Sequence, residues 1–76
     1  MALVPVARKS LSGDVFDQLA AEILEGRFEA GAMLPSEREL AEALQVNRGA
    51  IREAVHRLAQ AGLVDTRHGS GHHVLD

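Results

Sequence analysis

Hydrophobic positions near the start of the chain recur at the spacing of an amphipathic helix. They fall mostly three or four positions apart and therefore line one helical face. The members of this set are Val15, Phe16, Leu19, Ile23 and Leu24. Gly26 is typical of the residue that follows a helix C-terminus. The pattern predicts a first helix that begins after Ser12 or Gly13 and ends near Glu25.

A second, shorter helix is predicted at residues 37–44. Ser36 can accept a hydrogen bond from the backbone three positions on, and Glu39 can reach back to the backbone of Ser36, which is the pattern of a capping box. The inward positions of this helix are Leu40, Ala41 and Leu44. Before it, Met33 and Leu34 form at most a minimal strand.

The third helix is predicted at residues 48–61, directly after a turn at 45–47. Asn47 suits the N-cap, and Gly62 suits the position that follows a helix C-terminus. The inner stripe of this helix consists of Ile51, Ala54, Val55 and Leu58. A short helix, a tight turn and a longer helix together make a helix-turn-helix.

Two short runs of strand-forming residues follow the third helix. The runs LVDTR (63–67) and HHVL (72–75) are joined across the glycine-containing stretch HGSG, which predicts a small hairpin. We therefore expect a mainly α fold with a small β-hairpin, that is, a winged helix-turn-helix of three helices plus a two-stranded wing. This domain would occupy residues 10–76, behind a flexible N-terminal arm at residues 1–9.

The composition fits one small globular domain. The chain has 76 residues, of which 46% are hydrophobic and 25% charged, too apolar for a disordered segment. It has no cysteine, which fits a reducing cytoplasm, and no apolar run long enough to span a membrane. We expect neither an enzyme nor a cofactor, because no paired acids fall in a predicted pocket and Ser36 serves as a helix cap.

The formal net charge of −3 is unusual for a protein that binds nucleic acid, but the charges are unevenly distributed. Residues 10–30 contain five acids and one arginine, whereas residues 45–75 contain four arginines and two acids. Binding depends on where the charge lies rather than on its total. The C-terminal half is therefore the candidate for contact with nucleic acid.

Arg48 and Arg52 lie one turn apart at the start of the third helix. On a helical wheel they fall between the core stripe and the exposed side, and Gly49 falls in the middle of the exposed side. A recognition helix presents its N-terminal residues to the major groove, where arginine can bond to guanine. Arg38 could hold a phosphate where the second helix crosses the backbone. The alternative is ordinary surface charge, with Arg38 paired to Glu42.

Three histidines near the hairpin, His68, His72 and His73, raise the question of a metal site. Neighbouring strand residues point to opposite faces, and no cysteine accompanies them, so no metal site is expected. A metal- or proton-sensing switch in the hairpin remains an alternative function. Another is a winged helix used for protein–protein docking through its third helix, which an apolar exposed face on that helix would favour.

The run LPSERELAEALQVNRGAIREAVHRLAQAGLVDTRHGSGHHV resembles the N-terminal domain of the GntR family of bacterial transcription regulators. The resemblance covers about Ser10 to Leu75, and the SEREL and REA segments are most similar to the FadR-type branch. It implies a domain that binds double-stranded operator DNA sequence-specifically. The implied DNA contacts are Arg38, Arg48 and Arg52, the small residues Gly49 and Ala50, and His68 and Gly69 at the wing tip.

The resemblance also implies properties of a larger protein. Family members bind palindromic operators as homodimers, through a C-terminal domain that also senses a small-molecule effector. Because the chain stops at Asp76, we expect an excised DNA-binding domain of a regulator from the bacterial cytoplasm. The pair His72-His73 replaces the Thr-Phe or Thr-Tyr pair usual in this family, and this departure suggests a pH-sensitive wing.

Overall fold

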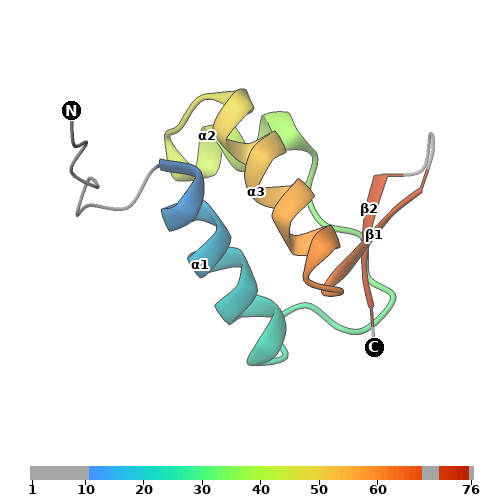
Figure 1. The fold of residues 1–76 in the computed structure, drawn as a ribbon. Helices are drawn as coiled ribbons and strands as arrows, with labels where there is room; N and C mark the ends of the chain where they lie inside the picture. Colours follow the sequence, from blue (N-terminus) through green and yellow to red (C-terminus); the bar gives the residue numbers. More distant parts are fainter. Residues whose placement is uncertain (1–10, 68–70, 76) are drawn as a thin grey trace, which may run out of the picture.

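The computed structural model describes residues 11–67 and 71–75 of the chain. The elements in chain order are the helices α1 (Leu11–Leu24), α2 (Glu37–Leu44) and α3 (Arg48–Gln60) and the strands β1 (Val64–Arg67) and β2 (Gly71–Val74). α3 packs against α1, α2 and β1, and the two strands lie beside the helices (Figure 1). The expected mainly α fold with a two-stranded wing is confirmed. The expected arm at residues 1–9 lies outside the described residues, as do His68 and Gly69 of the wing tip.

α1 begins at Leu11, two or three residues earlier than predicted. The reason is a contact with another helix. Ser12 is only 5% exposed, and its hydroxyl donates a hydrogen bond to the carboxylate of Glu53 in α3. Ser12 is therefore a packing residue inside the helix rather than a residue that precedes it.

The N-terminal caps of α2 and α3 are those predicted. Ser36 Oγ accepts a hydrogen bond from the Glu39 N–H at 3.1 Å, and Glu39 Oε1 accepts one from the Ser36 N–H at 2.9 Å. The bond from the Ser36 backbone lowers the pKa of Glu39, because it stabilises the charged carboxylate. In α3, Asn47 Oδ1 accepts a hydrogen bond from the Ala50 N–H at 2.7 Å.

α3 ends one residue earlier than predicted, with Ala61 as its C-cap. Gly62 follows with a φ of 80°, a backbone conformation that residues other than glycine rarely adopt. The N–H of Leu63 then donates to the carbonyl of Leu58 at 2.9 Å, which closes the motif typical of a glycine-terminated helix. This turn directs the chain from α3 straight into β1.

The hydrophobic core is built around the inner face of α3. Ile51, Ala54 and Leu58 of this helix are completely buried. Their neighbours in the core include Val15, Leu19 and Ile23 of α1, Leu40 and Ala41 of α2, and Val64 and Val74 of the wing. Burying one such aliphatic side chain stabilises the fold by roughly 1.5–3 kcal/mol. Because α3 is held from several sides, the direction of its outer face is fixed relative to α2 and the wing.

The wing is an antiparallel pair in which Val64 lies opposite Val74 and Thr66 lies opposite His72. β2 is also hydrogen-bonded to the segment that precedes α2. Leu34 donates its N–H to the carbonyl of His72 at 2.8 Å, and the predicted minimal strand at Met33 and Leu34 is present as a single bridge between Met33 and His73. β2 therefore lies between β1 and the α1–α2 connection.

Candidate nucleic-acid interface

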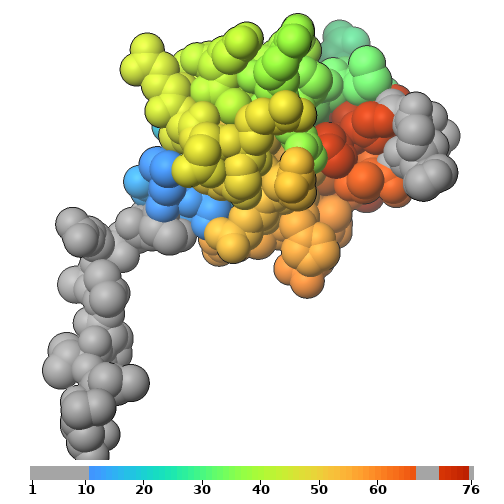
Figure 2. Space-filling model, turned by 90° about the horizontal axis from the view of Figure 1, so that it is seen from above, coloured from blue at the N-terminus to red at the C-terminus, as the bar shows by residue number. Residues whose placement is uncertain are grey.

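One face of the molecule brings together α2, the start of α3 and the base of the wing. Figure 2 shows these three parts side by side, with α2 and the start of α3 in yellow-green to gold and the strands in orange to red. A shallow depression between them is lined by Pro35 to Glu39 of the α2 start, by Arg48 of α3 and by Gly71 and His72 of β2. Residues from three separate parts of the chain thus meet at one surface.

Arg38 and Arg48 line this depression together. Both side chains are exposed, and neither guanidinium has a hydrogen bond or ion pair with any of the described residues. The alternative pair between Arg38 and Glu42 is accordingly not formed. Two cationic groups from different helices are therefore available to an anionic partner at this surface.

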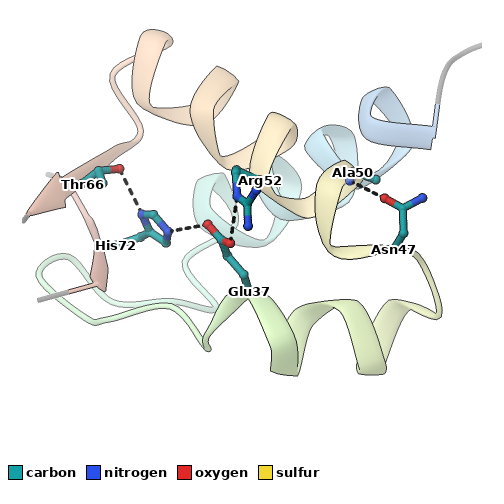
Figure 3. A network of polar contacts seen from close by, with 6 residues as sticks. All are labelled: Glu37, Asn47, Ala50, Arg52, Thr66 and His72. Carbon is teal, nitrogen blue, oxygen red and sulfur yellow. Dashed lines mark hydrogen bonds and ion pairs between the residues drawn. The ribbon is translucent and has the colours of Figure 1, made fainter. Parts of the chain in front are cut away.

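Arg52 lies one turn further along α3, and it contacts α2. Its Nε donates to Oε1 of Glu37 at 3.3 Å, while 68% of the Arg52 side chain is exposed (Figure 3). Within the described part of the chain this is its one hydrogen-bonded partner, so both terminal nitrogens of Arg52 remain unpaired. A guanidinium with two free N–H donors can bond bidentately to a base or a phosphate.

Of the two small residues between these arginines, one is exposed and the other is buried. Gly49 is exposed, which keeps the outer side of α3 free of bulk at its N-terminal end. Ala50 is 9% exposed and faces the core, and its backbone N–H is bonded to the Asn47 cap. Any contact between Ala50 and a ligand would therefore involve little of its side chain.

Glu37 and His72 are two members of this surface that the sequence does not assign to it. The helical pattern predicts Glu37 only as a first-turn residue of α2, and His72 stands out only as one of three hairpin histidines and as a departure from the family pattern. Glu37 and Arg52 are 15 positions apart and meet only because α2 packs against α3. Helical periodicity within one element carries no signal for such a contact.

Acids exceed basic residues on both α1 and α2: α1 has three acids and no arginine or lysine, and α2 has three acids and one arginine. At the end of α1, Glu22 pairs with Arg27 at 2.5 Å, and Arg27 also pairs with Glu25 at 2.8 Å. The C-terminal end of α1 is at the opposite end of the molecule from α2 (Figure 1). The surface formed by α2, the start of α3 and β2 is mixed in sign, so its arginines and not its net charge single it out as the candidate interface.

The outer face of α3 bears on the docking alternative. The exposed residues of this face are Arg48, Gly49, Arg52, Glu53, His56, Arg57 and Gln60. A polar face of this kind does not favour an apolar docking contact.

Among residues 11–67 and 71–75, no group of histidine and acidic side chains is placed to hold a metal ion. The helices of this described part are all too short or too polar to cross a membrane.

A short helix, a turn and a longer helix, followed by a two-stranded wing and with exposed arginines at the start of the longer helix, define a winged helix-turn-helix DNA-binding domain. Residues 11–74 match the family of bacterial regulatory proteins named gntR. The chain belongs to the GntR family, and residues 11–74 form the DNA-binding domain of that family.

Two curated relatives place the chain within this family. The chain is 54% identical over 69 residues to the HTH-type transcriptional regulator Mce2R of Mycobacterium tuberculosis, an alignment that covers 91% of the chain and 29% of Mce2R. It is 37% identical over 82 residues to the fatty acid metabolism regulator protein of Vibrio cholerae, covering 93% and 29%. The resemblance to the FadR-type branch is thereby confirmed. The chain spans less than a third of the length of these relatives, and their names are those of regulators, not enzymes.

A solved structure is similar to almost the whole chain. The AraR DNA-binding domain in complex with operator ORX1 superposes with a TM-score of 0.84 at 25% sequence identity. The match covers 97% of this chain and 92% of the AraR domain. The similar structure is thus a protein domain determined on its operator DNA.

Proposed function

We propose that this domain recognises a specific operator sequence, with the start of α3 in the major groove and the wing at a flanking groove. The observation that carries the proposal is that exposed arginines meet at the N-terminal end of α3: Arg38 and Arg48 line one depression, and Arg52 bonds Glu37, which lines the same depression. Recognition helices enter the groove by this end, and phosphate contacts on either side fix their register.

The arginines of α3 and the arginine of α2 have different proposed roles. Arg48 and Arg52 read base edges or hold the flanking phosphates, and Arg38 anchors a phosphate from α2. Gly49 allows the α3 backbone to approach the bases closely, and any contact by Ala50 is limited to the small part of it that is exposed. His68 and Gly69, which lie outside the described residues, are proposed as the wing-tip contacts.

In the larger protein we propose that two such domains act on a palindromic operator in the bacterial cytoplasm. Dimerisation and the binding of a small-molecule effector would belong to a C-terminal domain. A single domain would then contact a half-site, and its affinity would lie near the non-specific range of roughly 10⁻⁴–10⁻⁶ M at physiological salt.

Replacing Arg52 tests the base-reading role. Operator sequences are first selected from a random DNA pool, and binding of wild type and Arg52→Ala is then titrated across single-base variants. If Arg52 reads a base, the change should cost about 1–3 kcal/mol and relax specificity at one position. Arg27→Ala is the matched control, because it removes an exposed arginine that follows α1 and does not line the proposed interface. Unchanged binding of Arg52→Ala would refute the role.

Replacing Arg38 tests the phosphate-anchoring role. A phosphate contact carries no sequence information, so Arg38→Ala should weaken binding to all operator variants by a similar factor. It should also reduce the slope of log K against log salt by about 1, because one fewer counterion is released. Isothermal titration or fluorescence anisotropy at four salt concentrations gives this slope. An unchanged slope would exclude a phosphate contact by Arg38.

A further inference from the structure

A continuous set of polar contacts links the wing to α3 (Figure 3). Thr66 Oγ1 of β1 and His72 Nδ1 of β2 share a hydrogen bond at 3.0 Å. His72 Nε2 lies 3.5 Å from Oε2 of Glu37, the first residue of α2. The other carboxylate oxygen of Glu37 accepts the hydrogen bond from Arg52 Nε at 3.3 Å. Glu37 is therefore shared between a wing histidine and an arginine of α3.

The contact with Glu37 constrains how Arg52 is presented. Arg52 is a long and mostly exposed side chain, and such a side chain loses considerable rotamer entropy when it is ordered. Glu37 engages the Nε of Arg52 and leaves both terminal nitrogens unpaired within the described residues. A contact of this kind orders the guanidinium in advance while keeping its bidentate edge free for a partner.

His72 is placed to hold Glu37 in position. The side chains of His72 and Glu37 are only 16% and 22% exposed, so their interaction is screened less than that of an open surface pair. In the protonated imidazole both ring nitrogens are donors, one facing Glu37 and the other facing Thr66. Protonation therefore turns a contact between a neutral ring and a carboxylate into an ion pair, which restrains Glu37 more strongly.

The charged surroundings of His72 are close to balanced. The charged side chains that line the depression together with His72 are Glu37, Arg38, Glu39 and Arg48. These two acids and two arginines cancel, and Arg52, which bonds Glu37 from α3, adds one positive charge that a proton on His72 raises further. From β1 it is Thr66 that faces His72, whereas the acid Asp65 lies opposite His73 in the strand register. Adjacent strand positions point to opposite faces, so His73 belongs to the other side of the wing.

We propose that His72 is a positioning residue for DNA recognition: in its protonated form it holds Glu37, Glu37 orients Arg52, and operator binding strengthens as the pH falls through the range in which histidine titrates. This inference rests on the proposed role of Arg52 in binding DNA. By linkage, a protonated form that binds more tightly also requires that DNA binding take up protons at His72.

The first test compares pH profiles of operator affinity. Binding to a selected operator is measured between about pH 5.5 and about pH 8, where histidine changes charge, for wild type, His72→Gln and His73→Gln. Relative to His72→Gln, wild type should gain about two- to fivefold in affinity at the acidic end, the size expected of a partly exposed ion pair. His73→Gln is the matched control and should keep the wild-type profile. Identical profiles for wild type and His72→Gln would overturn the proposal.

A second test uses the free 76-residue chain, without DNA. The NMR signal of the Arg52 Nε–H should shift with the same pH midpoint as the His72 ring, and Glu37→Gln should abolish this correlation. If the Arg52 signal does not shift together with that of the His72 ring, the proposed connection from His72 through Glu37 to Arg52 is overturned, whatever the binding measurements show. If the correlation is found but no operator is bound, the link is supported and it is the proposed DNA recognition that fails.

Discussion

Gly49 and Asn47 constrain each other at the first turn of α3. A Cβ added to Gly49 would lie 3.2 Å from Oδ1 of Asn47, closer than an ordinary van der Waals contact. That oxygen already accepts the N–H of Ala50 at 2.7 Å. The missing side chain at Gly49 therefore leaves room for the cap, and the same absence keeps the exposed end of α3 narrow.

Removing the Asn47 cap should destabilise the domain. In Asn47→Ala the N–H of Ala50 loses its protein acceptor, and such a loss costs about 1 kcal/mol. Urea denaturation at neutral pH measures the change in the free energy of unfolding. Asn47→Asp retains the accepting oxygen and should stay close to wild type. If both variants lose the same free energy of unfolding, the stabilisation comes from the amide group of Asn47 and not from the capping hydrogen bond.

How well single residues can be predicted depends on the sequence distance of their contacts. The roles of Ser36 and Asn47 as caps are predictable, because each bonds a backbone group three positions away. The contacts of Ser12 with Glu53 and of Glu37 with Arg52 are not, since they join different helices. The roles of the three arginines in binding DNA remain predictions, because they concern a partner rather than the fold.

At the scale of elements, α2 depends on its capping box more than a long helix would. It has 8 residues, and isolated helices of this length are not stable in water. The ends of α2 and α3 are predictable within one residue because caps and terminal glycines act locally. The sequence pattern places the start of α1 too late, because the first turn of α1 is fixed by packing against α3.

The capping box makes part of the stability of α2 depend on pH. The pKa of Glu39 is lowered by the hydrogen bond from the Ser36 backbone. This stabilisation is complete above the pKa of a glutamate in the unfolded chain, about 4.3, and is lost as the pH falls through the lower folded-state value. Wild type should be more stable than Glu39→Gln at pH about 7, and the difference should shrink toward pH about 3.

Thermal unfolding across this pH range measures that difference. Glu42→Gln is a matched control, because it removes an exposed acid of α2 that is not part of the box. A difference between wild type and Glu39→Gln that stays constant with pH would contradict the assignment.

At the scale of the whole molecule, most of the buried packing lies between α3 and the elements that surround it, α1, α2 and β1. Leu58 is completely buried, whereas Leu24 at the end of α1 is 73% exposed. Leu58→Ala removes packed methyl groups and should cost about 2–5 kcal/mol, a large share of the stability of so small a domain. Leu24→Ala should stay within about 0.5 kcal/mol of wild type. Chemical denaturation of both variants checks the contrast, and equal losses would show that the core is placed elsewhere.

The attachment of β2 has a mechanical consequence. Val74 accepts the N–H of Gly31 at 2.8 Å and donates to the carbonyl of Ala32 at 2.9 Å, while His72 accepts the N–H of Leu34 at 2.8 Å. The outgoing end of the wing is thus tied to the few residues that lead into the first turn of α2. A tension applied to the chain after Val74 would therefore act on this connecting segment, which leads directly into the start of α2 where Glu37 and Arg38 lie.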